Sequence, residues 1–197
     1  VIISADGKHI ISGSDDATVK LWDFSSGKEM CSFKGHSEWV TCVAASKDGK
    51  HIISASVDKT LKLWEIGKKK AARTFKGHYG PINRVIFSAD GKYILSGSND
   101  STIKSWDVLN GKELHTFKGH KGTVTCIGIT ADGNHLISGS DDYTLKLWDL
   151  KKKKCIRTIN LLWIPFDIKQ IPGKPYFFAT ANGNGTVTFF DFGDMKL

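Results

Sequence analysis

The chain has 197 residues and a formal net charge of +8; 40% of its residues are hydrophobic and 24% are charged. This composition is ordinary for a soluble globular protein, and no apolar run approaches the ~18 residues of a membrane-spanning helix. The excess of lysine permits an acidic partner but does not identify one.

The first residues, VIISADGKHI, contain no initiator Met, basic segment or signal-peptide core. We therefore expect a segment of a larger protein with a cytoplasmic location. The cysteines show no CxxC spacing and no dense framework, which favours free, mostly buried thiols over disulfides. They are Cys31, Cys42, Cys126 and Cys155.

From the start of the chain, short β-branched runs alternate with turn residues. In TLKLW at 60–64, Leu61 and Leu63 fall on one face of an extended strand and Lys62 on the other. Turn sequences such as KDGK, SVDK and FKGH interrupt the runs at intervals of roughly 8–12 residues. This pattern predicts strands and argues against helix pairs, which need amphipathic runs of about 10 residues or more.

Three markers repeat with one period of 42 residues and no insertion. The tryptophan of KLWD recurs, and Phe190 takes its place in the fifth copy: Trp22, Trp64, Trp106, Trp148. GH recurs in the same register, ending at His36, His78 and His120. DG recurs at 6–7, 48–49, 90–91 and 132–133. The period therefore predicts a fold built from repeated structural units.

A unit of this length built from four antiparallel strands predicts an all-β fold, a β-propeller of four-stranded blades. We expect a single propeller segment over residues 1–197, with five blades and incomplete first and last blades. The expected blades are 1–34, 38–75, 80–117, 122–159 and 162–192. A seven-bladed ring would need about 294 residues at this period. We therefore expect an open arc, whose free edges favour self-association.

The pattern GH…SxSxDxTxKxWD resembles the WD-repeat β-propellers of the G-protein β-subunit type over essentially the whole chain. The resemblance implies a buried tetrad in each blade, in which the GH histidine, a Ser or Thr, a turn Asp and the Trp are hydrogen-bonded. By position, the complete sets are His36–Ser54–Asp58–Trp64, His78–Ser96–Asp100–Trp106 and His120–Ser138–Asp142–Trp148. The first blade keeps Ser12, Asp16 and Trp22, and the fifth keeps Thr180 but has Leu162, Asn184 and Phe190 in the other slots.

Ser, His and Asp are also the parts of a hydrolase triad. A nucleophilic serine must be exposed beside its base and an oxyanion site. Ser54 instead lies on an interior strand on the face packed by Trp64, and the constellation occurs in three complete copies. The structural interpretation is therefore favoured, with no enzyme activity. His9, His51 and His135 share a slot with Tyr93, which argues against a metal site, and no cofactor is implied.

The resemblance also implies that partners bind the loops at the GH end. The favoured positions lie three and five residues after the GH histidine, and just before the turn Asp. In this chain they are Trp39, Thr41, Pro81, Asn83, Thr123, Thr125, Asp15, Val57, Asn99 and Asp141. These slots vary between otherwise matching repeats. Trp39 is the best candidate anchor; the alternative is that it packs against the neighbouring blade.

Lysines cluster in the turns at the opposite end, which predicts either a basic platform for phosphate-rich partners or, more simply, a solvated surface. The positions are Lys8, Lys28, Lys50, Lys92, Lys112, Lys68–Lys70 and Lys151–Lys154. In the fifth blade, Leu161, Leu162, Trp163 and Phe166 are apolar where other copies are polar; they either pack against a missing element or form a partner patch.

The leading functional hypothesis is a non-catalytic scaffold that binds peptides or protein surfaces through the loop face. The alternatives are a sensor or regulatory module of a larger multidomain signalling enzyme, and a nucleic-acid-associated adaptor that uses the basic surface.

Overall fold

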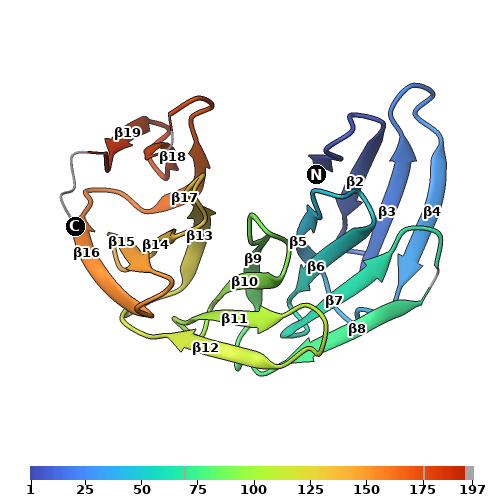
Figure 1. The fold of residues 1–197 in the computed structure, drawn as a ribbon, viewed down its shortest axis with the longest axis horizontal. Coiled ribbons are helices and arrows are strands. Elements are labelled where there is room, and N and C mark those ends of the chain that lie inside the picture. The colour runs from blue at the N-terminus through green and yellow to red at the C-terminus, as the bar shows by residue number, and fades with distance from the viewer. Residues whose placement is uncertain (69, 175, 194–197) are drawn as a thin grey trace.

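A computed structural model describes residues 1–68, 70–174 and 176–193 of the chain (Figure 1). The strands in these ranges form five sheets, and within each sheet every strand pairs antiparallel with its neighbours in sequence. No described helix is long and apolar enough to cross a membrane. The all-β prediction is confirmed.

Four of the sheets contain four consecutive strands each. The first comprises β1 (Ile2–Ile3), β2 (His9–Gly13), β3 (Thr18–Asp23) and β4 (Glu29–Lys34). The second comprises β5 (Val40–Ala45), β6 (His51–Ser56), β7 (Thr60–Glu65) and β8 (Ala71–Lys76). The third comprises β9 (Ile82–Phe87), β10 (Tyr93–Ser98), β11 (Ile103–Asp107) and β12 (Glu113–Phe117). The fourth comprises β13 (Val124–Ile129), β14 (His135–Ser140), β15 (Thr144–Asp149) and β16 (Lys154–Asn160).

The fifth sheet has three strands within the described residues, β17 (Pro165–Gln170), β18 (Phe177–Asn182) and β19 (Val187–Asp191). The five sheets follow one another around an open arc, with the first and fifth on either side of the opening (Figure 1). The inner strands β5, β9, β13 and β17 contact one another in sequence order. The chain is therefore a partial propeller, with a short β1 at one end and a three-stranded sheet at the other.

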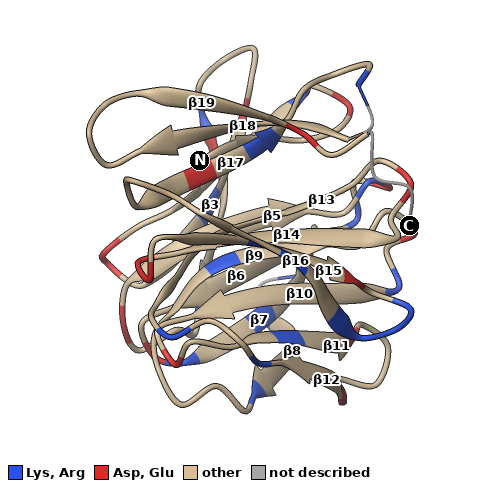
Figure 2. Cartoon of the chain, turned by 90° about the vertical axis from the view of Figure 1, so that its left-hand side faces the viewer, with Lys and Arg blue, Asp and Glu red and all other residues tan. Residues whose placement is uncertain are grey.

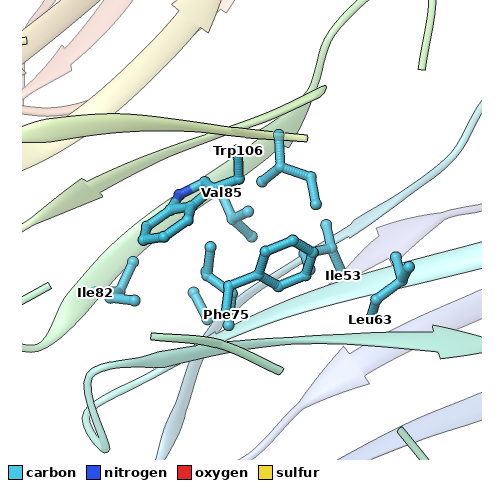
Figure 3. Close-up of a cluster of buried hydrophobic side chains, with 9 residues drawn as sticks. Ile53, Leu63, Phe75, Ile82, Val85 and Trp106 are labelled. Atoms are coloured by element: carbon cyan, nitrogen blue, oxygen red, sulfur yellow. The ribbon is translucent and has the colours of Figure 1, made fainter. Parts of the chain in front are cut away.

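The core lies between successive sheets, because side chains alternate across each strand. In β6 the adjacent residues Ile52 and Ile53 are both fully buried, but they belong to different hydrophobic clusters. Ile53 packs in the cluster between the second and third sheets, where the rings of Phe75 and Trp106 meet edge to face with centroids 6.0 Å apart (Figure 3). Each middle sheet is thus sandwiched by its neighbours.

In the first four sheets, a β-bulge in the pairing of the third and fourth strands precedes the tryptophan at the repeated KLWD position. In the second sheet the register shifts between Leu63 and Trp64, and the other three shifts fall before Trp22, Trp106 and Trp148. A bulge re-aims the side chain that follows it. Each of the four indole N–H groups is directed at the second strand of its own sheet, and Trp64, Trp106 and Trp148 are also buried.

Candidate functional site: the loop surface at the GH end

The repeat positions singled out in the sequence meet at the same end of each sheet. In the second sheet, His36 precedes β5, Ser54 lies on β6, Asp58 follows β6 and Trp64 lies on β7. The ring of His36 is 2.7 Å from Asp58 at Nδ1 and 2.7 Å from the Ser54 hydroxyl at Nε2. The indole of Trp64 donates to Ser54 Oγ at 2.9 Å.

The third and fourth sheets repeat this arrangement. His78 lies 2.7 Å from Asp100 and 2.8 Å from Ser96, and Trp106 donates to Ser96 Oγ at 2.9 Å. In the fourth sheet the corresponding distances are 3.0, 2.7 and 2.8 Å, among His120, Asp142, Ser138 and Trp148.

The protonation states of His36 and Asp58 define the direction of each hydrogen bond in this tetrad. Burial lowers the pKa of His36, against the opposing effect of Asp58, so the ring is neutral near pH 7. Burial raises the pKa of Asp58, but hydrogen bonds from Thr60 and His36 outweigh it and hold that carboxyl below its usual value. The ionised Asp58 accepts from His36 Nδ1–H, so Nε2 accepts from the Ser54 hydroxyl.

At Asp100, burial is outweighed by hydrogen bonds from His78 and Thr102, which hold the pKa of that carboxyl well below its usual value. The set in the fourth sheet follows the same physics as that of His36. Burial also lowers the pKa of His120. At Asp142, burial is outweighed by hydrogen bonds from Thr144, the Lys121 amide and His120, and the pKa falls to about 2. Each chain of bonds therefore ends on a carboxylate that remains ionised in any ordinary buffer.

The Ser–His–Asp order reproduces the connectivity of a hydrolase triad, but the serine is not accessible. Ser54, Ser96 and Ser138 are each 0% exposed. Their Oγ atoms also accept the indole N–H of a buried tryptophan. A nucleophile must reach its substrate and stand beside an oxyanion site, so this arrangement suits bracing and not acyl transfer.

The first and fifth sheets carry incomplete versions of the tetrad. Trp22 donates to Ser12 Oγ at 2.9 Å but is only half-buried, and the carboxylate of Asp16 bonds within its own turn to Thr18. In the fifth sheet Thr180 bonds to Asn182. Asn184 bonds to Thr186.

The tetrads hold the loops that carry the predicted contact positions. The turn aspartates also accept the backbone N–H of the residue after each GH histidine: Ser37 to Asp58 at 3.2 Å, Tyr79 to Asp100 at 2.9 Å and Lys121 to Asp142 at 2.8 Å. A second backbone bond links the two predicted slots in each sheet: Val57 to Trp39 at 3.0 Å, Asn99 to Pro81 at 2.9 Å and Asp141 to Thr123 at 3.0 Å. The loops are therefore fixed by the fold.

The residues five positions after the GH histidine bond to the next sheet. Thr41 donates to the carbonyls of Ala55 and Ile82, and Thr125 donates to that of Pro165. Asn83 donates to the Val124 carbonyl at 3.0 Å and to Asn99 Oδ1 at 2.7 Å. The hydrogen-bond donors of these side chains are therefore already used within the fold, at the junctions between sheets.

Trp39 differs from the other predicted positions because it is large and 56% exposed. Asp15, Thr41 and Asn99 are exposed but small, and the remaining positions are half-buried. Exposed aromatics that sequence reasoning did not single out share this end of the molecule. Tyr79, directly after His78, is 85% exposed, and Tyr143 follows Asp142 with φ 62° and is also exposed. The signal for Tyr79 was its place next to GH.

The fifth-sheet apolar stretch divides in two. Leu161 is half-buried and packs against the cluster of the fourth and fifth sheets. Leu162, Trp163 and Phe166 are exposed. We call the GH loops (35–41, 77–83, 119–125) together with the Asp turns (14–17, 57–59, 99–101, 141–143) the loop surface.

The lysine turns lie at the other end of the sheets. All the predicted positions that the structure describes are exposed, and Lys69 lies outside the described residues. Lys151–Lys154, which run from the turn after β15 into the first residue of β16, form a continuous blue segment at the right of Figure 2. Among residues 1–68, 70–174 and 176–193, no group of three or more His, Cys, Asp or Glu is placed to hold a metal ion.

Comparison with known proteins identifies the repeat. The profile of the family described as WD domain, G-beta repeat matches residues 1–23, 27–65, 69–107 and 111–149. The chain is 44% identical over 46 residues to the U3 small nucleolar RNA-associated protein 15 homolog of Xenopus laevis, covering 23% of this chain and 9% of that protein. It is 47% identical over 36 residues to the nuclear distribution protein PAC1-2 of Postia placenta, covering 18% of this chain and 8% of that protein. The matches thus span less than a tenth of either relative, about the length of one repeat.

Proposed function

We propose that this chain, which belongs to the WD40 repeat family, is a non-catalytic scaffold that binds peptides or protein surfaces through its loop surface. WD40 domains typically bind proteins and are usually non-catalytic. The proposal includes a cytoplasmic location, supported by the four cysteines, which are free thiols. The expectation that they are mostly buried is wrong, because only Cys126 is buried and Cys155 is exposed.

One observation carries the proposal: a large aromatic side chain is exposed on a loop that the fold holds in place. Trp39 is 56% exposed. The backbone of its loop is held by the hydrogen bond from Val57 and, through Ser37, by Asp58. Aromatic residues are enriched among binding hot spots, and a loop already ordered loses little entropy when a partner binds.

Neighbouring groups extend the surface. Tyr79 offers a second exposed ring on the next GH loop. The variable slots Asn99 and Asp141 add an amide and a carboxylate on fixed turns. An extended peptide that crosses from one loop to the next would meet rings and polar groups in turn, which is how specific interfaces are usually composed.

The proposal is tested with peptides selected against the whole chain from a phage-displayed library. The affinity of a selected peptide is measured for the wild type, for Trp39→Ala and for Phe24→Ala. Phe24 is a matched control because it is 53% exposed but lies in the turn between β3 and β4, at the opposite end.

We expect Trp39→Ala to weaken binding at least tenfold while its melting temperature stays within about 2 °C of the wild type, since surface substitutions change stability little. Phe24→Ala should bind as the wild type does. Equal affinity for all three proteins contradicts the proposal. A large loss of stability in Trp39→Ala shows instead that this ring packs as part of the fold.

The lysine turns favour a second candidate function, contact with an acidic or phosphate-rich partner such as a nucleic acid. Its support is the net charge of +8 and the exposure of the described lysines. Such binding weakens steeply with salt because counterions are released from the phosphates. Affinity for a 20-mer single-stranded RNA that does not change between 50 and 200 mM salt would eliminate it.

A further inference from the structure

A pocket lies between the third and fourth sheets, at the end away from the loop surface. Its volume is about 380 Å³, in the range of small-molecule sites. Leu95, Phe117 and Leu150 give it an apolar interior, and Lys151 and Lys153, both exposed, stand at its rim. Neither the tetrads nor the loop surface uses any of these side chains.

The pocket exists because two repeat positions that hold a leucine and an arginine in the second sheet hold a serine and a histidine in the third. Leu21, Leu63 and Leu147 are buried at one repeat slot, and Ser105 takes that slot in the third sheet. Ser105 lines the pocket.

The junction between the second and third sheets is a natural comparison. There, Leu63 fills the corresponding place in the core, and Arg73 crosses the junction to donate to the Leu109 carbonyl. One repeat later the same slots hold Ser105, His115 and Lys151. The loss of a leucine side chain and of a guanidinium opens the space that the earlier junction fills.

The charge at the rim is one-sided. The described lining contains two lysines and no carboxylate. Glu113, next to the lining residue Leu114, is engaged by Lys104 at 2.8 Å and by Thr116. Asp132, next to Gly133, is engaged by Thr130, Asn134 and Tyr176. The ammonium groups of Lys151 and Lys153 are therefore left to solvent or to a ligand.

The backbone of Lys153 is a further anomaly. Its φ is 55°, in the left-handed region, where glycine is favoured. The same slot holds Gly27 and Gly111, with φ of 66° and 75°. A non-glycine residue retained in this conformation is strained, and such strain concentrates at functional sites.

His115 completes the wall as a neutral ring. Burial, and next the charge of Lys153, lower its pKa, against a hydrogen bond to the Lys153 backbone. The ring meets Phe117 edge to face, with centroids 4.6 Å apart. The interior thus has aromatic and apolar walls at neutral pH, with positive charge confined to the rim.

We propose that this pocket binds a small amphipathic carboxylic acid. The apolar body packs against Leu95, Phe117 and Leu150, and the carboxylate pairs with the ammonium groups of Lys151 and Lys153. The proposal is independent of the function of the loop surface.

The test uses 2-naphthoate as the probe and 2-naphthamide as its uncharged counterpart, with binding followed by NMR shift changes in the whole chain. A ligand of this size that fills the pocket should bind with a Kd of about 1 mM or tighter. The wild type should prefer the acid to the amide at least fivefold.

Three variants separate the parts of the site. Ser105→Leu restores the leucine of the other repeats and should weaken binding of acid and amide alike at least tenfold. Lys153→Gly, combined with Lys151→Gln, should bring the acid-to-amide ratio close to one without lowering the melting temperature, because glycine relieves the left-handed strain. Lys50→Gln, an exposed lysine outside the pocket, should change neither.

The proposal is overturned if 2-naphthoate produces no saturable shift at 10 mM, or if acid and amide bind the wild type equally. Unchanged binding by a folded Ser105→Leu protein also overturns it. If that variant does not fold, the acid-to-amide ratio of the double lysine variant decides: a ratio that stays at the wild-type value refutes the assigned role of the lysines.

Discussion

The serine of each tetrad offers a sharp test of bracing, because the first and third sheets use it differently. Ser96 Oγ bonds to both Trp106 and His78, and all three side chains are buried. Ser12 Oγ bonds to Trp22, which is half-buried. Replacing each serine by alanine should therefore have unequal effects.

The magnitudes follow from the groups left without partners. Ser96→Ala strands a buried indole N–H and a buried imidazole nitrogen, at about 1–3 kcal/mol each, so we expect a loss of roughly 3 kcal/mol in the free energy of unfolding. Ser12→Ala affects one bond whose indole water can reach, so we expect about 0.5–1 kcal/mol. A chain of this size should then melt about 6–12 °C lower for Ser96→Ala and about 1–4 °C lower for Ser12→Ala.

Urea unfolding and thermal melts on both variants supply the measurement, with Ser96→Thr as the control. Threonine keeps the hydroxyl, and the fifth sheet already carries Thr180 at this slot, fully buried. We expect Ser96→Thr to recover most of the lost stability. Equal losses for Ser96→Ala and Ser12→Ala, or a loss below ~0.5 kcal/mol for Ser96→Ala, would show that the buried serine does not brace its sheet.

Two further predictions concern pH and packing. Because the pKa values of His36 and His120 are lowered in the folded chain, the unfolded chain binds protons first, and the urea midpoint should fall as pH drops below about 6.5. The midpoint should fall again between about pH 4 and pH 2, as Asp142, with a folded pKa of about 2, takes up its proton. A urea midpoint that stays constant from pH 7.5 to 5 would contradict the histidine step. Gly97→Ala would place a Cβ 2.6 Å from Val124 Cγ1 across the sheet junction, so a loss of about 1–3 kcal/mol is expected in the same urea assay, and unchanged stability would show that this junction yields easily.

Much of the architecture could be predicted from the sequence, because a 42-residue period transfers each inference from one repeat to the next. The family resemblance, carried over by the repeat register, assigned His36, Ser54 and Asp58 to one cluster, and the structure brings them within hydrogen-bond distance. The alternation in TLKLW predicted β7, with Leu61 and Leu63 buried and Lys62 half-buried.

What the sequence did not predict depends on contacts between neighbouring repeats. The bonds of Thr41 and Thr125 to the next sheet become visible only once the sheets are placed side by side. The pocket arises because Ser105 and His115 face the same junction, although each substitution alone looks unremarkable in the sequence. The exposure of Trp39 could not be predicted from the sequence either, because it depends on how the side chain is oriented in the folded chain.

Hydrogen–deuterium exchange of the whole chain, measured with and without a selected peptide, shows whether partners bind the loop surface. Exchange maps slowed amides along the backbone and so reports where a partner lies. We expect added protection in residues 35–41 and 77–83, and none in the turns at 24–28, 108–112 and 150–154. Protection concentrated in those turns, with the GH loops unchanged, would contradict it.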